Sequence, residues 1–195
     1  TINLLGHVIT STQATGKLFT VHNGAHLEIN GQPLENNDTS AIVGTIRVGK
    51  SNNDNGSLTI NGGTYTSLEG KKQAAIQSNG TCTDCDIEIN SAKVKSEDDI
   101  AVYIGGGGQI TITNSRIEGN TGIYAKAGDF IISGSTIGAN GDCVPVVGNT
   151  NGAYTNGNAI VLDSSDGYTG GDITLAIDNT IIVSVKGYGI YEVVT

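Results

Sequence analysis

The sequence predicts an all-β protein that folds as a parallel β-helix of about seven rungs. Three observations support this fold class. Runs of helix-forming residues are nearly absent from the 195 residues, 29 residues are glycine and only 2 are proline, and one short sequence unit recurs along the chain. Short alternating strands in a repeated unit are typical of a solenoid, in which each repeat stacks on the one before it.

The recurring unit consists of an apolar anchor, four mostly small or polar residues, and a second apolar residue. It occurs as the pairs Ile29 and Leu34, Ile60 and Tyr65, Ile89 and Val94, Ile112 and Ile117, Ile132 and Ile137, and Ile177 and Ile182. Each anchor closes an alternating strand such as HLEI at 26–29, and alternation indicates a strand with one buried face. The anchors are 31, 29, 23, 20 and 45 residues apart, so the longest interval holds an insertion, residues 141–157.

A polar residue follows every anchor, which predicts a stacked column at one turn of the coil. The column contains Asn30, Asn61, Asn90, Thr113, Ser133 and Asp178. In such a turn, side-chain amides of successive rungs can bond to one another. Gly31, Gly62 and Gly134 come next, where a turn can require a positive φ.

Composition limits the function classes. With 19 acidic and 10 basic residues the formal charge is −9, and binding to a phosphate backbone needs dense Lys and Arg. No apolar stretch approaches the roughly 20 residues that span a bilayer. We therefore expect no nucleic-acid partner and no membrane insertion. Neither end resembles a polar cap, so we expect residues 1–195 to be one domain excised from a larger protein, with its ends covered by further domains of the same polypeptide or by a neighbouring chain.

The three cysteines leave several pairings open. The stretch CTDC at 82–85 could form a local disulfide, a redox pair or half of a metal site. A second CxxC and a nearby histidine are missing, as is the βαβ pattern that accompanies a redox motif. A structural disulfide or simple free thiols are therefore the favoured interpretations, and Cys143 is left over.

The motif SLTINGGTYTS at 57–67 and the rungs after it resemble right-handed β-helices of the pectin-lyase-like superfamily. In particular, they resemble repeat stretches of large secreted or wall-attached bacterial proteins. The resemblance covers roughly residues 15–195 and implies a right-handed coil. It does not select an activity, because that superfamily includes lyases, glycosidases, phage tailspikes and non-catalytic adhesins.

Two adjacent carboxylates, Asp98 and Asp99, are weak candidates for catalysis, because paired carboxylates can cleave glycosidic bonds. Their stretch SEDDIAVYIG is similar to the paired-aspartate rung of polygalacturonase-type glycosidases, where a third aspartate and a histidine complete the site. Stacking of the rungs places Lys72 before the pair and Gly119 after it, and neither partner is found. We interpret the pair as a turn, with Lys72 as an exposed ion-pair partner.

Arg116 is a weak candidate for the base of a pectate-type lyase, with Lys93 one rung earlier in the same column. Those lyases hold Ca²⁺ with clustered aspartates, and no such cluster lies beside Arg116. The alternative is that Lys93, Lys95 and Arg116 form a basic patch. That patch could hold uronate or sialate groups, or it could serve only solubility and edge protection.

A second candidate surface is an outward column on the strands that include TIRV at 45–48. It contains Arg47, Gln77, Tyr103, Tyr124, Val161 and Tyr191. Tyr103 and Tyr124 should lie side by side on consecutive rungs. A flat aromatic pair can stack on a sugar ring, or it can stabilise the sheet as a cross-strand pair.

The loop DSSDGYTGGD holds Asp163, Asp166 and Asp172 among glycines, and oxygen ligands on such a loop suit Ca²⁺. The EF-hand spacing is absent, so an ordinary polar loop is the alternative. The loop SNNDNGS at 51–57 is a weaker candidate of the same kind. No other cofactor is expected.

These observations lead to three functional hypotheses. The first is a non-catalytic, secreted or cell-surface module that binds a glycan, possibly acidic, as an adhesive segment of a bacterial surface protein. The second is a polysaccharide-degrading enzyme of the polygalacturonase or pectate-lyase kind. The third is a passive structural stalk.

Overall fold

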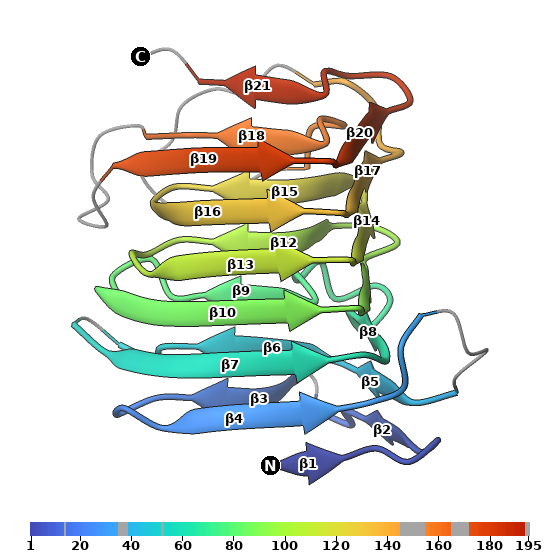
Figure 1. Cartoon of the computed structure of the whole chain (residues 1–195), viewed down its shortest axis with the longest axis vertical. Coiled ribbons are helices and arrows are strands. Elements are labelled where there is room, and N and C mark those ends of the chain that lie inside the picture. Colours follow the sequence, from blue (N-terminus) through green and yellow to red (C-terminus); the bar gives the residue numbers. More distant parts are fainter. Residues whose placement is uncertain (14, 35–38, 52, 145–154, 165–171, 194–195) are drawn as a thin grey trace.

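The chain forms a parallel β-helix of seven rungs, as the sequence predicts. The computed structural model describes residues 1–13, 15–34, 39–51, 53–144, 155–164 and 172–193. Its strands form three parallel sheets of seven strands, and every third strand along the chain joins the same sheet. In Figure 1 the chain runs to the right along the front sheet, passes behind and returns to the left while it rises, which is a right-handed coil.

Each rung contributes one strand to each sheet. Sheet A contains β1 (Ile2–Asn3), β4 (His26–Asn30), β7 (Asn55–Asn61), β10 (Asp84–Asn90), β13 (Gln109–Thr113), β16 (Gly128–Ser133) and β19 (Ile173–Asp178). Sheet B contains β2 (Val8–Thr10), β5 (Ala41–Val43), β8 (Thr64–Thr66), β11 (Lys93–Lys95), β14 (Arg116–Gly119), β17 (Thr136–Ala139) and β20 (Ile181–Ser184). Sheet C contains β3 (Lys17–Val21), β6 (Thr45–Val48), β9 (Ile76–Ser78), β12 (Ile100–Ile104), β15 (Thr121–Ala125), β18 (Ile160–Leu162) and β21 (Ile190–Glu192).

The predicted anchors form one continuous column on the inner face of sheet A. Register pairs join Ile29, Ile60, Ile89, Ile112, Ile132 and Ile177 in that order, and Ile2 precedes them. The five anchors from Ile29 to Ile132 are almost completely buried. Alternation along each strand therefore points one side chain in two into a single core.

The second predicted column is correct except at its first member. Tyr65, Val94, Ile117, Ile137 and Ile182 are register neighbours in sheet B. The residue that precedes Tyr65 is Ile42, which is fully buried, whereas Leu34 is exposed. The turn before β5 is longer than in the other rungs, so the spacing that fits elsewhere gave the wrong residue here.

The polar column forms a directional hydrogen-bond ladder at the turn between sheets A and B. The Nδ2 atoms of Asn30, Asn61 and Asn90 donate to the Oδ1 atom of the asparagine one rung below, at 3.0, 2.9 and 3.1 Å. The Thr113 hydroxyl continues the series by donating to Asn90 Oδ1. At Gly62 φ is +72°, and an added Cβ would lie 2.4 Å from the carbonyl oxygen of Gln32. This turn therefore requires glycine.

The corner between sheets B and C varies most in length. Between β14 and β15 it consists of Asn120 alone, whereas it spans residues 67–75 between β8 and β9. Between β17 and β18 it spans 140–159, which includes the predicted insertion at 141–157. Residues 145–154 of that insertion lie outside the described part of the chain. The sheets keep their register across all of these turns.

A second, smaller apolar cluster lies on the outer face of sheet C. It contains the buried residues Ala74, Ile100, Tyr124, Val161 and Val193, and Tyr103 and Tyr191 pack against it. The outward column predicted from sequence exists in the expected register. Much of it is covered, however, so its apolar members stabilise the fold.

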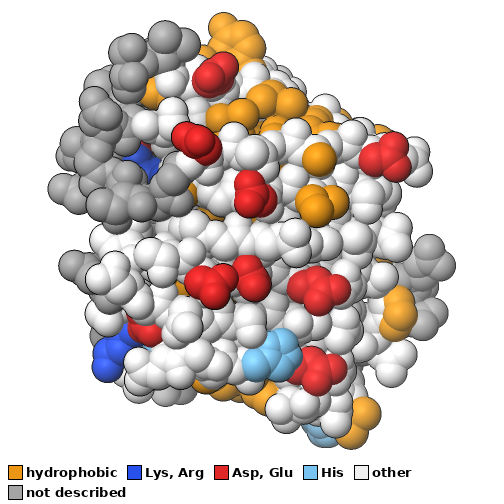
Figure 2. Space-filling view, turned by 60° about the vertical axis from the view of Figure 1, so that its left-hand side comes forward, with side chains coloured by type: hydrophobic (Ala, Val, Ile, Leu, Met, Phe, Trp, Pro, Cys, Tyr) orange, Lys and Arg blue, Asp and Glu red, His pale blue; other side chains and the backbone are white. Residues whose placement is uncertain are grey.

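Burial decreases at the C-terminal rung. Ile177 and Ile190 continue inner columns, yet 37% and 46% of their surface is exposed. In Figure 2 hydrophobic side chains gather toward this end, while acidic side chains are spread over the face below. Among the described residues, no helix is long and apolar enough to cross a membrane.

Candidate functional site

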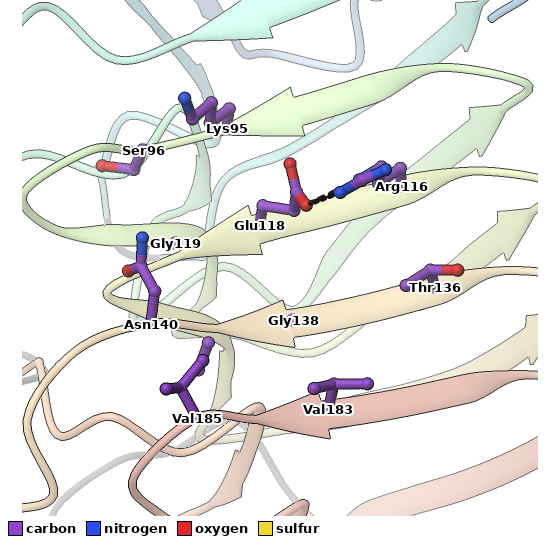
Figure 3. A pocket seen from close by; sticks show the side chains of 11 residues that line it. Lys95, Ser96, Arg116, Glu118, Gly119, Thr136, Gly138, Asn140, Val183 and Val185 are labelled. Carbon is purple, nitrogen blue, oxygen red and sulfur yellow. Dashed lines mark hydrogen bonds and ion pairs between the residues drawn. The ribbon is translucent and has the colours of Figure 1, made fainter.

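A groove of about 410 Å³ lies on the outer face of sheet B, across rungs four to seven (Figure 3). It is lined by Lys95, Ser96, Arg116, Glu118, Gly119, Thr136, Gly138, Ala139, Asn140, Val183 and Val185. The strands β11, β14, β17 and β20 cross it side by side. It contains two of the three residues of the predicted basic patch and lies next to the third, Lys93.

The depth of the groove follows from the residues of one outward column. Register pairs align Lys95, Glu118, Gly138 and Val183 on four successive strands. Gly138 has no side chain, and an added Cβ would come within ordinary contact distance of the Glu118 Cγ atom, 3.8 Å. The missing side chain between Glu118 and Val183 opens the hollow that Figure 3 shows.

The two ends of the groove differ in polarity. Charged side chains from β11 and β14 occupy one end, and Val183 and Val185 form the other. The valines are 47% and 69% exposed. Thr136 and Asn140 lie between these ends and supply uncharged hydrogen-bonding groups. A ligand in the groove would therefore meet a charged end, a polar middle and an apolar end.

Glu118 organises the charged end. It accepts a hydrogen bond from Arg116 Nε at 2.6 Å, forms an ion pair with Arg116, and lies 3.6 Å from Lys93 Nζ. Burial works to raise the pKa of Glu118, but Arg116 and Lys93 outweigh it and hold the pKa below its ordinary value. Lys95 is aligned with Glu118, as predicted, but it forms its ion pair with Glu97.

Arg116 is the most accessible of these charges, with 56% of its side chain exposed. A guanidinium group has five N–H donors. Glu118 contacts the Nε and Nη2 atoms of Arg116 and does not use all five donors. The group can thus bind an anion while it remains paired. Among the described residues that line the groove, Glu118 is the one carboxylate, whereas glycosidic cleavage uses two.

The predicted pair Asp98 and Asp99 lies on the turn after β11, outside the groove. Asp98 Oδ2 accepts the amide of Gly70 at 3.0 Å, and Asp99 Oδ1 accepts the amide of Ile100 at 2.8 Å. These bonds agree with the turn interpretation. Burial, followed by the charge of Asp98, raises the pKa of Asp99. Lys72 is the neighbour predicted from stacking, but neither carboxylate forms an ion pair with it.

Tyr103 and Tyr124 are register neighbours on β12 and β15, as predicted. Their ring centroids are 6.3 Å apart, and the rings are tilted by 52°. Tyr124 is buried, and its hydroxyl donates to Asp163 Oδ2 at 2.6 Å. The two rings therefore do not form a flat, exposed platform. Only Tyr103 is partly accessible.

Two of the three predicted calcium ligands, Asp163 and Asp172, lie among the described residues. Asp163 is fully buried and pairs with Lys126, whose Nζ atom lies 2.8 Å from Oδ2. The ammonium group occupies the place beside this carboxylate that a bound cation would need. Asp172 is exposed, and Asp166 lies outside the described residues. In the part of the chain that the structure describes, no group of three or more His, Cys, Asp or Glu could hold a metal ion.

The weaker calcium candidate is the loop at 51–57, whose buried aspartate accepts hydrogen bonds from the backbone. Asp54 accepts the backbone amides of Asn23, Lys50 and Asn55 at 2.7–2.9 Å. Cys82 and Cys85 form a disulfide at a neighbouring turn, which is one of the two favoured interpretations of CTDC, and Cys143 is free and exposed. Asp54 and the disulfide fix turns between sheets C and A.

Sequence reasoning missed two features of these sites. Lys126 was not considered, although it continues β15 directly and points to the outer side like Tyr124, two residues earlier. Gly138 was not considered either, because a glycine signals a hollow only once its register between Glu118 and Val183 is known.

Comparisons of the chain with protein-family models, with curated proteins and with solved structures found no match. Fold and geometry are therefore the basis for assigning a function.

Proposed function

We propose that this chain is a non-catalytic glycan-binding module and that the groove on sheet B binds an acidic glycan. The observation that carries the proposal is the groove itself. Arg116 and Lys95 line one end together with Glu118, whose negative charge is paired with Arg116, and Val183 and Val185 line the other end. Uronate and sialate residues combine a carboxylate with hydroxyls and an apolar ring face, which matches this order of groups.

The ligand would make two kinds of contact. Its carboxylate would accept charge-assisted hydrogen bonds from Arg116, with support from Lys93 on the adjacent strand. A neighbouring ring would lie over Gly138 and against Val183, where the missing side chain gives room. Because the chain is acidic overall, this attraction is local and should weaken as salt rises.

We further propose that the chain belongs to the pectin-lyase-like superfamily and acts as a secreted or cell-surface segment of a bacterial adhesive protein. The parallel coil supports the first part. The disulfide between Cys82 and Cys85 supports the second, because disulfides persist in oxidising compartments.

A glycan array tests the binding proposal. The Lys93→Ala/Arg116→Ala double variant should lose most of the retention on acidic glycans. The Lys50→Ala/Lys71→Ala variant has the same charge change away from the groove and should keep it. Glu118→Gln should bind more tightly, because it releases Arg116 and Lys93 from their carboxylate partner.

Three outcomes would contradict the proposal. Equal retention of all variants would show that the groove is not the site. Absence of retention on every glycan would favour a passive stalk. Release of reducing ends or unsaturated uronates from pectins by the wild-type chain would favour an enzyme.

A further inference from the structure

A second, smaller cavity of about 190 Å³ lies on the outer face of sheet C, at rungs three and four. It is lined by Lys72, Gln73, Ala74, Gln77, Asp99, Ile100 and Tyr103. It is separate from the groove, although one turn borders both. Ser96 at the start of that turn lines the groove, and Asp99 at its end lines the cavity.

The coil brings these groups together by stacking. Gln77 on β9 and Tyr103 on β12 are register partners. Lys72 and Gln73 lie just before β9, and Asp99 lies just before β12. The cavity thus collects an ammonium group, two amides, a carboxylate and a phenol ring from two neighbouring rungs.

The two charged residues that line this cavity, Lys72 and Asp99, do not form an ion pair with each other. Lys72 forms no ion pair with Asp98 or Asp99 in the described part of the chain, although they occupy adjacent rungs. Asp98 Oδ1 and Arg47 Nε are buried without a hydrogen-bond partner. Asp98 adjoins the lining residue Asp99, and Arg47 is the register partner of the lining residue Gln77. Buried polar atoms without partners are rare in native proteins, and these two flank the cavity without belonging to a residue that lines it.

We propose that this cavity binds a single neutral sugar ring. A hydroxyl both donates and accepts hydrogen bonds, whereas an ammonium only donates and a carboxylate only accepts. A polyhydroxylated ring can therefore satisfy Lys72, Asp99 and the amide of Gln77 at once. An anion would be repelled by Asp99 with Asp98 behind it, and a cation by Lys72 with Arg47 nearby.

The size and the wall of the cavity agree with this ligand. Its volume is below the ~300–1,000 Å³ of pockets for drug-sized ligands, so it fits one ring and excludes a chain of rings buried side by side. Tyr103 is half-buried at its edge and presents part of an aromatic ring, which is an apolar surface for sugar C–H groups. The inference does not rest on the proposed function, because none of the cavity residues lines the groove.

The test is an NMR titration of the ¹⁵N-labelled chain with the methyl glycosides of glucose, galactose, mannose and N-acetylglucosamine. At least one should produce saturable shifts centred on Gln77, Asp99 and Tyr103. Lys72→Gln and Gln77→Leu should each weaken that binding about tenfold, the loss expected for a hydrogen bond of roughly 1.4 kcal/mol. Lys71→Gln is the matched control for Lys72, and an unchanged spectrum away from the cavity confirms the fold of each variant.

Further comparisons separate this site from the groove. The Lys93→Ala/Arg116→Ala variant should bind the methyl glycosides as the wild-type chain does. Loss of binding in that variant, retention of full affinity in both Lys72→Gln and Gln77→Leu, or no saturable shift with any glycoside would overturn the inference. So would tighter binding of methyl glucuronide than of methyl glucoside, because the ligand would then be acidic.

Discussion

At the scale of single residues, Asp54 shows how one side chain fixes a turn of the coil. Its carboxylate is buried and accepts backbone amides from Asn23 on the rung below and from Lys50 and Asn55 in its own turn. The bonds from Asn23 and Lys50 hold the pKa of Asp54 at about 2. The carboxylate therefore joins two rungs in its charged form.

Replacement of Asp54 should make the stability of the fold less dependent on pH in the acid range. The folded pKa lies below the unfolded value of about 3.9, so the stabilisation is complete above that value and is lost as pH falls through about 2. Asp54→Asn should lower Tm at pH 7, and the difference from the wild-type chain should shrink below pH ~4. Glu69→Gln changes the same charge at an exposed site and serves as the control. A Tm difference that stays constant from neutral pH to pH 2 would contradict this role.

Residue-scale partners were only partly predictable from the sequence. Aligning rungs was enough to place Lys93 beside Arg116 and Lys95 beside Glu118. It could not show that Glu118 turns toward Arg116, because the choice depends on side-chain conformations within the column. The buried ion pair of Lys126 and Asp163 could not be predicted either. The two residues are 37 apart in sequence, and no local sequence pattern indicates that they are neighbours.

At the scale of elements, the asparagine ladder ties the ends of the sheet A strands to one another. Asn61 at the end of β7 is its central member, because it donates to Asn30 and accepts from Asn90. The ladder runs alongside the backbone hydrogen bonds of the sheet and closes the turn where Gly62 adopts a positive φ.

Asn61→Ala should therefore destabilise the fold by about 1–3 kcal/mol, because it removes two hydrogen bonds of the ladder, the one to Asn30 Oδ1 and the one from Asn90 Nδ2. Thr59→Ala, on the outer face of the same strand, is the control and should have a smaller effect. Urea unfolding measures both free energies. Equal effects of the two substitutions would mean that the ladder adds nothing beyond strand propensity.

The elements themselves were largely predictable, and the exceptions have a physical cause. Periodic isoleucines such as Ile60 and Ile89 reveal the inner column, because a strand must alternate to bury one face. Leu34 was assigned to the next column because it is apolar and has the spacing of the other rungs. Ile42 takes that place instead, and the length of a turn cannot be read from the period of the strands it joins.

At the scale of the whole molecule, burial changes along the axis of the coil. An anchor in a middle rung is covered by a rung on each side, whereas an anchor in the last described rung is covered on one side. Ile89 is fully buried and Ile177 is 37% exposed, although both belong to the same column. Their contributions to stability should differ accordingly.

Ile89→Ala should cost about 2–5 kcal/mol, the usual range for a buried isoleucine. Ile177→Ala should cost clearly less, because less surface is removed from water and no closed cavity is left. Urea unfolding measures the free energy of unfolding of both variants. Each variant serves as the control for the other, because both carry the same substitution in the same column. A larger loss for Ile177→Ala would mean that the last rung is covered in solution by something else.

The corner between sheets B and C ranges from the single residue Asn120 to the span 140–159, and the strands on either side keep their alignment. The strands on either side of this corner therefore stay in their sheets whatever the length of the turn. An evolving gene can lengthen such a turn and leave the isoleucine columns untouched. New surface loops can in this way arise on one edge of the coil at little cost to the rest of the protein.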